Sequence, residues 1–320
     1  MLAIHLITDT SAIYRWNFNR DISLVYVYSL VLLTMLAFSG NALLTRAALA
    51  SYNMDPELVL LLRVFAGAIT LLLICYLRKY PLKIFSNLHL KTTAALSLYL
   101  VGFSYAFTGL ETGIGVLIQF GVVQLVMFAS SFLSDQQVPK NKSIGAVIAF
   151  TGLIYLLWPS GDFTLDMKSS VLMAIAGMAW GIYSILGKNA ESAISATTAS
   201  FLLSTPICLI VILLLPNNTG FSWSNNGALL AICSGAITSG MGYALWYYVL
   251  PKIPSTNAAV SQLSVPLIAA AGGMIFMQEL ITLKFILSCV LVLGGIAITI
   301  GIPKSGRPVS YTHLTLPTKA

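Results

Sequence analysis

Several polar side chains interrupt the long apolar runs of this sequence, and their types suit the binding of a small molecule. They are one arginine and four amides: Asn41, Arg63, Gln119, Gln124 and Gln262. Burying such groups away from water is costly, so they usually face a cavity or a partner side chain. Amides can orient the polar groups of a solute, and a guanidinium can bind a carboxylate. The pattern therefore predicts reversible recognition of a solute.

Two of the amides stand at matching places in the two halves of the chain. Gln119 lies in GIGVLIQFGVV and Gln262 in TNAAVSQLSVP, each about two turns from the start of its apolar run. They can line a central path, or they can form a hydrogen bond that holds the two halves together. Gln124 lies further along the run of Gln119 and favours a polar cavity there, and Asn41 belongs to the same class.

Arg63 also has two interpretations. It lies about two turns inside its apolar run, in ELVLLLRVFAG. It can contact a carboxylate or a helix C-terminus, or it can reach the interface or pair with Asp55 or Glu57. The sequence slightly favours the second, structural role.

Trp180 and Pro266 complete the candidate residues for a solute cavity. Trp180 is too near the middle of its apolar run for the aromatic belt of a membrane interface, so it can stack on a flat or apolar solute or fill the core. Pro266 follows the second repeated glutamine by one helical turn. A proline kinks a helix and frees a backbone carbonyl, and such breaks at membrane depth often mark transport sites.

No group of residues in the sequence resembles the active site of a soluble enzyme or a metal site. The histidines lie near the ends or in a loop, and the cysteines are far apart inside apolar runs. These residues are His5, His89, His313, Cys75, Cys208, Cys233 and Cys289. We therefore expect no catalytic residue, no metal and no cofactor, and a protein that is not an enzyme.

The composition indicates an integral membrane protein. Hydrophobic residues make up 58% of the chain and charged residues 8%, against about 25% charged residues in soluble domains. A bilayer is therefore the expected partner. The net charge of +7 does not indicate nucleic-acid binding, because the basic residues are dispersed in short loops. The predicted all-α fold has ten membrane spans, near 22–50, 57–77, 92–110, 113–133, 143–159, 169–188, 196–215, 227–250, 256–277 and 283–301.

The two halves are related by an internal repeat. At the offset that aligns the two glutamines, further pairs coincide: Gly113 with Thr256, Val147 with Val290, and Gly152 with Gly295. Because each half holds an odd number of spans, the two repeats must insert with opposite orientations, as in many secondary transporters. The expected divisions are a lead segment (1–21), a first repeat (22–160), a loop (161–168), a second repeat (169–301) and a polar tail, suspected to be non-native (302–320).

Lysine and arginine positions predict the orientation in the membrane. With the N-terminus inside, the outer connections keep only Arg46, Lys168 and Lys284. The inner segments hold Arg15, Arg20, Arg78, Lys79, Lys83, Lys91, Lys140, Lys142, Lys188, Lys252, Lys304, Arg307 and Lys319. This bias predicts that both termini lie in the cytoplasm of a cell whose inner membrane holds the protein.

The second half resembles the EamA-type transporters of the drug/metabolite transporter superfamily. The residues that carry the resemblance are Tyr243-Ala244, Ala258-Ala259, Pro266, Glu279 and Gly294-Gly295. The first half is similar in AFSGNALLTRAALA and LLRVFAGAITLLL, although Val123 and Gln136 stand where the family pattern has Pro and Glu. The resemblance implies ten helices in two inverted five-helix repeats, a central cavity, and export of metabolites or amino acids.

The sequence thus predicts a secondary transporter that exports a small organic solute by alternating access. A membrane enzyme should show His, Asp or Glu clustered at one interface, which this chain lacks. A non-transporting subunit should lack paired amides inside its spans. No Asp or Glu lies in the middle of a span, so a carboxylate proton relay has no candidate.

Overall fold

The computed structural model describes residues 10–82, 84–133, 140–158, 165–187, 190–214, 222–253, 261–262 and 264–300. Helices are the only regular elements in this part of the chain, which agrees with the predicted fold class. In chain order they are α1 (Thr10–Arg46), η1 (Ala47–Ser51), α2 (Pro56–Arg78), α3 (Asn87–Ala106), α4 (Thr112–Leu133), α5 (Lys140–Leu157), α6 (Met167–Gly187), α7 (Ala193–Leu214), α8 (Asn225–Cys233), η2 (Ser234–Met241), α9 (Gly242–Val249), η3 (Leu250–Lys252), α11 (Ser264–Met277) and α12 (Leu283–Ile300).

The boundaries of several helices follow from local residue chemistry. Pro56 occupies the first turn of α2, where its missing N–H costs nothing, and Lys79 ends that helix in the left-handed conformation. Ser86 caps α3 by accepting a hydrogen bond from the His89 amide at 3.1 Å. Ser224 caps α8 through the amide of Gly227.

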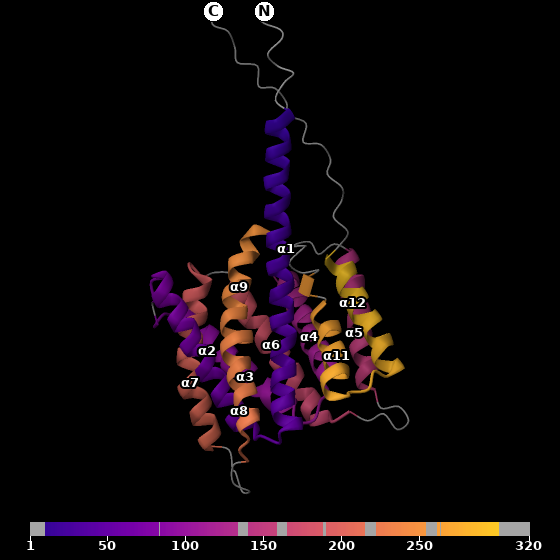
Figure 1. The fold of residues 1–320 in the computed structure, drawn as a ribbon. Coiled ribbons are helices and arrows are strands. Elements are labelled where there is room, and N and C mark those ends of the chain that lie inside the picture. The colour runs from indigo at the N-terminus through magenta and orange to yellow at the C-terminus, as the bar shows by residue number, and fades with distance from the viewer. Residues whose placement is uncertain are drawn as a thin grey trace, which may run out of the picture.

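The first helix begins earlier than the sequence predicted. Residues 10–21 fall in the expected lead segment, yet they are helical and continuous with the rest of α1. The upper half of α1 projects beyond the other helices (Figure 1). Residues 1–9, the first half of the loop at 161–168 and the tail at 302–320 lie outside the described residues.

Five of the described helical segments are long and apolar enough to cross a membrane. They are Val25–Ser51, Pro56–Arg78, Met167–Gly187, Ala193–Leu214 and Asn225–Val249. Four shorter apolar segments accompany them: Thr112–Met127, Ser143–Leu156, Ser264–Met277 and Leu283–Ile298. The chain is thus a helical protein with apolar spans, whereas the predicted count of ten spans remains a prediction.

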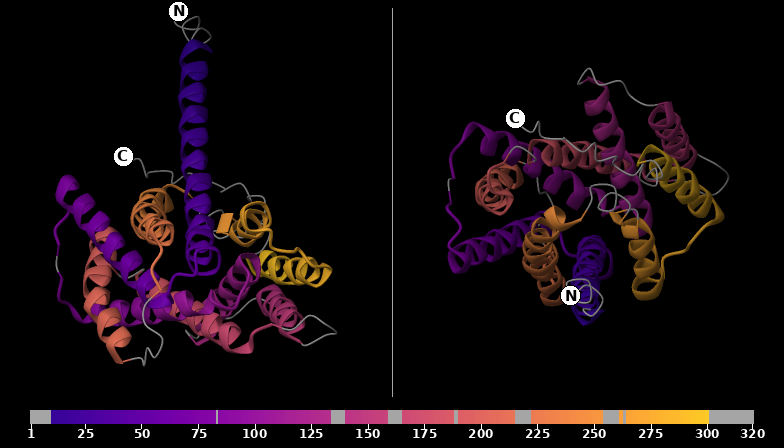
Figure 2. Two further views of the ribbon diagram at one scale, coloured as in Figure 1. Left: turned by 60° about the horizontal axis from the view of Figure 1, so that its bottom comes forward. Right: turned by 90° about the horizontal axis from the view of Figure 1, so that it is seen from above.

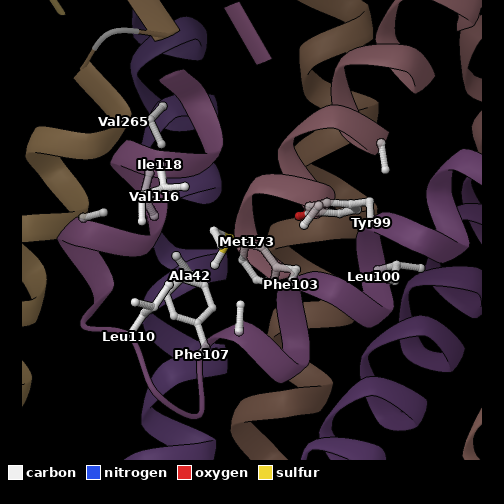
Figure 3. Packing of buried hydrophobic residues seen from close by; sticks show 14 of the residues in the cluster. Ala42, Tyr99, Leu100, Phe103, Phe107, Leu110, Val116, Ile118, Met173 and Val265 are labelled. Atoms are coloured by element: carbon white, nitrogen blue, oxygen red, sulfur yellow. The ribbon is translucent and has the colours of Figure 1, made fainter. Parts of the chain in front are cut away.

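The helices pack side by side around a buried core. α3 contacts α6 and α7, α4 contacts α6 and α11, and α1 contacts α11, η2 and α9. α2 packs against α7 and η2, and α5 packs against α12 at the edge of the bundle (Figure 2). Figure 3 shows Phe103 and Phe107 beside Met173 in the core. The rings of Phe103 and Phe107 pack edge to face, with their centroids 4.7 Å apart.

Glycines permit the closest approach between α5 and α12. A Cβ at Gly152 would lie 2.7 Å from the Cβ of Leu291, and one at Gly295 would lie 3.0 Å from the Cα of Ala149. Such small residues let membrane helices pack backbone to backbone. Both members of a glycine pair that the repeat aligns therefore lie in one interface.

Candidate functional site

A cavity lies where α1, α3, α4, α6 and α9 meet residue 262. It contains about 400 Å³ of space that no atom fills, including its open mouth. Four of the candidate residues line it together, namely Asn41, Gln119, Trp180 and Gln262. The remaining lining residues are Phe38, Ala42, Tyr99, Phe103, Val116, Phe120 and Tyr243. The wall is therefore aromatic, with amides as its polar groups.

Asn41 is held in place by both ends of its amide. Its Oδ1 accepts a hydrogen bond from Ser234 Oγ at 2.7 Å and a longer one from Ser239 Oγ at 3.5 Å. Its Nδ2 donates to Tyr99 Oη at 3.5 Å. The two serines belong to η2, a π-helical stretch of the kind that often occurs at functional sites. Asn41 thus joins three helical segments while it faces the cavity.

Gln119 and Gln262 differ from Asn41 because their amides make no hydrogen bond to the part of the chain that the structure describes. Gln119 is 4% exposed, and Gln262 is half-buried. Both nevertheless line the cavity, one from α4 and the other at residue 262. A buried amide without a partner is costly. The structure therefore does not contain the amide bond between repeats that the sequence allowed.

Trp180 lies in the middle of an aromatic cluster on one wall. Its ring stacks on Tyr243 with centroids 5.1 Å apart and on Tyr183 at 5.4 Å. It also contacts the Tyr99 ring at 4.9 Å. Trp180 thus packs into the core on one side and lines the cavity on another, while its stacking on a solute stays a prediction.

Arg63 is completely buried, and its side chain points toward the cavity wall rather than the interface. Its Nη2 donates to Tyr99 Oη at 2.9 Å, and its guanidinium lies 4.5 Å from the centre of the Phe103 ring. It does not pair with Glu57, whose carboxylate accepts a hydrogen bond from Tyr105 Oη at 2.8 Å. The favoured structural role through Glu57 or the interface is therefore not what the structure contains.

The other two candidates do not line the cavity. Gln124 is half-buried further along α4. Pro266 is buried in α11, where the carbonyl of its neighbour Val265 accepts a hydrogen bond from Ser39 Oγ at 3.1 Å. Pro266 thus lies where α11 is tied to α1, one turn from the lining residue Gln262.

A second set of polar residues lies at one end of the helix bundle and links the ends of several helices. We call it the Arg46 cluster, and its members are Arg46, Glu111, Thr112 and Glu279. Glu279 Oε2 accepts a hydrogen bond from the Thr112 amide at 2.8 Å, and its Oε1 lies 3.5 Å from Arg46 Nε. Arg46 Nη1 donates to the carbonyl of Phe107 at 2.8 Å. Glu279 therefore links the end of α11 to the end of α1 and the start of α4.

Glu111 completes the cluster without joining its hydrogen bonds. Burial raises the pKa of its carboxyl above the usual value, the Glu279 carboxylate raises it further, and Arg46 opposes this shift. The cluster therefore holds two carboxylates and one arginine, an arrangement in which added protons are readily accepted.

Sequence reasoning missed the residues that position the candidates. Ser234 and Ser239 hold Asn41, and the Tyr99 hydroxyl receives both Asn41 and Arg63. The signal available was the small polar stretch SGAITSG inside an apolar span. Helix periodicity does not disclose a π-helix, whose extra residue per turn changes which side chains share a face.

A family model and several related sequences match this chain, and they indicate one family. Residues 167–301 match the model of the EamA-like transporter family. An uncharacterized protein of Pseudomonas aeruginosa, PA1977, is 34% identical over 278 residues, which cover 87% of this chain and 95% of that protein. The uncharacterized transporter YoaV of Bacillus subtilis is 23% identical over 77% of this chain and 87% of its own.

Two further similarities extend this result. The threonine/homoserine exporter RhtA of Salmonella typhimurium is 25% identical over 73% of this chain and 79% of its own. A solved crystal structure matches with a TM-score of 0.60 and 17% identity, covering 86% of this chain and 97% of that one. At that identity the match shows a shared fold.

Proposed function

The chain belongs to the EamA-like transporter family, and we propose that it is a secondary transporter that moves a small organic solute through the cavity by alternating access. The observation that carries the proposal is the pair of repeated glutamines. Gln119 and Gln262 come from opposite halves, line one cavity and keep their amides free of hydrogen bonds within the described residues. Unpaired amides facing one space are suited to a solute that supplies the missing partners.

The contacts between helices support two repeats of five helices. We compare the helix contacts after exchanging α1, α2, α3, α4 and α5 for α6, α7, the α8–η2–α9 segment, α11 and α12. The most extensive contacts are then preserved, whereas those of α4 with α5 and of α1 with α4 have no equally extensive counterpart. The contact of α3 with α6 becomes that of α9 with α1, and the contact of α4 with α6 becomes that of α11 with α1. The pairs α2–α7, α4–α11 and α5–α12 map onto themselves.

Individual residues follow the same exchange. Gly102 of α3 approaches the Cβ of Ala176, and Gly242 of α9 approaches the Cβ of Ala37 in the matching helix pair. The aligned valines Val147 and Val290 are both 65% exposed. Five helices per repeat is an odd number, which gives the two repeats opposed orientations in a membrane.

The charge distribution supports a cytoplasmic location for both termini. Arg46, Lys168 and Lys284 lie at the ends of α1, α6 and α12 that share one end of the bundle. The other end of the described bundle carries Arg78 and Lys79 at the end of α2, Lys91 near the start of α3, and Lys252 after α9. Because positive residues favour the cytoplasm, the Arg46 cluster belongs on the outer side.

The Arg46 cluster then supplies the closure that alternating access requires. It ties the ends of α1 and α3, the start of α4 and the end of α11 on the outer side of the cavity. Opening toward the outside must break these contacts, while the cavity itself stays formed by the same aromatic and amide side chains. The residues at 254–260, which precede Gln262, lie outside the described part of the chain.

The experiment that tests this function is an efflux screen. Cells that express the protein are loaded with a panel of amino acids and small organic acids, and efflux is compared among the wild type, Gln119→Ala and Gln262→Ala. Gln124→Ala is the matched control, because Gln124 is an amide on α4 that does not line the cavity. We expect both cavity variants to lose efflux while the control keeps it. Unchanged efflux in folded cavity variants would contradict the proposal.

A further inference from the structure

Arg63 is a buried cation whose hydrogen bonds are incomplete. It is the largest of the fully buried side chains in the described part of the chain and is 0% exposed. Among the described residues, Tyr99 Oη is the hydrogen-bond partner of Arg63 Nη2 at 2.9 Å, whereas Arg63 Nε and Nη1 have no partner. A guanidinium carries five N–H donors, and burying charged donors without acceptors is strongly unfavourable. The interior therefore contains a site that lacks an acceptor.

No carboxylate of the described residues neutralises this cation. Glu279 forms an ion pair with Arg46 at the end of the bundle. Asp55 accepts a hydrogen bond from the Ser222 amide at 2.6 Å, and Glu57 accepts one from Tyr105. The rings of Phe103 and Tyr99, centred 4.5 and 5.5 Å from the guanidinium carbon, offset part of the charge without removing it.

The same two aromatic residues form part of the cavity wall. Tyr99 and Phe103 line the cavity and separate it from Arg63 by the thickness of one side chain. The oxygen of Tyr99 accepts from both Arg63 and Asn41, so its own proton can be donated only to the Tyr243 hydroxyl, with which Tyr99 also interacts, or to an acceptor that replaces it. The hydroxyl next to the cavity is thus a donor that a buried positive charge polarises.

None of the described residues that line the cavity is acidic, so no carboxylate among them balances this field. The polar lining residues are amides and phenols, and the remaining ones are apolar or aromatic. In a water-poor interior a charge acts over a longer range than it does in bulk water. The positive charge of Arg63 would therefore repel an ammonium group in the cavity, and no carboxylate of the described lining would offset this repulsion. An anion would be attracted by the same charge and could accept a hydrogen bond from the Tyr99 hydroxyl.

From this arrangement we infer that the cavity selects solutes with a net negative charge, above all a carboxylate on an aromatic or apolar body, with Arg63 as the residue that sets the charge preference. The inference rests on the proposed function, because it assigns a substrate class to the same cavity. Trp180 and Tyr243 provide the surface for the apolar body. Arg63 acts through Tyr99 and through its field, so it is a positioning residue.

Binding to the purified full chain tests the inference with three probes of one shape. Phenylacetate, phenylacetamide and phenethylammonium differ mainly in charge, and binding is followed by the rise in Tm with concentration. We expect phenylacetate to bind about ten-fold more tightly than phenylacetamide, because a charge-assisted hydrogen bond exceeds a neutral one by roughly that much. Phenethylammonium should be the weakest of the three.

Three variants separate a role in charge preference from a role in folding. Arg63→Met should bring the ratio between phenylacetate and phenylacetamide close to one, and Arg63→Lys should retain a preference for the anion. Arg46→Gln removes a cation that already has a partner at the bundle end, so its ratio should equal that of the wild type. If Arg63→Met does not fold, the lysine variant and the wild-type ratios still decide the question.

Several results would overturn the inference. Equal binding of the three probes to the wild type, or no stabilisation by phenylacetate, would show that the cavity has no charge preference for anions. A full anion preference in Arg63→Met would show that another group sets it. Efflux of neutral solutes by a protein that ignores phenylacetate would refute this inference and leave the transporter assignment intact. Binding of phenylacetate without flux of any solute would refute the transporter and leave the charge preference.

Discussion

Replacing Glu279 with glutamine is expected to open the end of the bundle that the Arg46 cluster closes. Glu279 Oε2 accepts from the Thr112 amide at 2.8 Å, and Oε1 accepts from Thr112 Oγ1 at 3.1 Å. Hydrogen bonds to a charged group contribute about 1.5–3 kcal/mol each, and glutamine keeps only one acceptor oxygen. The Arg46 contact at 3.5 Å adds little, because a single long ion pair near a surface contributes at most about 1 kcal/mol.

These values give an expected loss of about 2–3 kcal/mol for the closed state relative to an open one. Since about 1.4 kcal/mol changes an equilibrium tenfold, the open state should become about 30- to 140-fold more populated. The change is large only if the contacts exist in the closed state and not in the open one.

The assay is the accessibility of a cysteine in the cavity. Cys233 is the half-buried native cysteine, so it is replaced with serine, and a cysteine is placed at Val116 on the cavity wall. A membrane-impermeant maleimide added outside should then modify position 116 faster in Glu279→Gln than in the wild type. Glu57→Gln is the matched control, because Glu57 also lies at this end but bonds only to Tyr105.

Two results would refute this reasoning. One is a lower Tm for Glu279→Gln with no change in the modification rate, which would make Glu279 a structural residue only. The other is an equal increase in Glu57→Gln, which would mean that general loosening of the helix ends exposes the cavity.

Three further predictions concern single side chains. Glu111→Gln should raise Tm at neutral pH, because the fold raises the pKa of the Glu111 carboxyl and so disfavours its charged form. The stability that Glu111 contributes is present at acid pH and is lost as pH rises through its folded pKa. When Tm is measured at a series of values between about pH 4 and pH 8, it should therefore depend less on pH in the variant than in the wild type. Gly152→Val should destabilise the protein by about 1–3 kcal/mol through overpacking against α12, as measured by thermal unfolding, while Gly294→Val, whose position has nothing within 4 Å, should not. Ser234→Ala should weaken solute binding several-fold with a stability loss of about 1 kcal/mol, because Asn41 loses its 2.7 Å hydrogen bond; equal weakening in Ser184→Ala, whose hydroxyl bonds within its own helix, would contradict this.

The helical class and the meeting of the amides were predictable, because hydropathy and an internal repeat both depend on local sequence. Gln119 and Gln262 occupy equivalent positions, so a pseudo-symmetric bundle brings them to one place. The start of α1 was predicted too late because the apolar run, rather than helix propensity, set the boundary. Residues 10–21 contain neither glycine nor proline, so nothing in them stops a helix.

The partners of the polar residues were not predictable from sequence. Depth in a span indicates that Arg63 is buried, but only the packing of α2 beside α3 brings its guanidinium to Tyr99. Glu57 lies six residues earlier on the same helix and therefore on a different face. The hold on Asn41 depends on a π-helix, which has no signature in hydrophobic periodicity. Glu279 and Thr112 are far apart in the chain, and only the packing of α4 against α11 brings them together.

The most direct test of the central claim is a structure of the protein determined with a transported solute bound. We expect solute density in the cavity between Gln119 and Gln262, with an amide hydrogen bond to the solute and the apolar part of the solute against Trp180. Density for a transported solute at any other place in the helix bundle, with this cavity unchanged and empty, would contradict this claim.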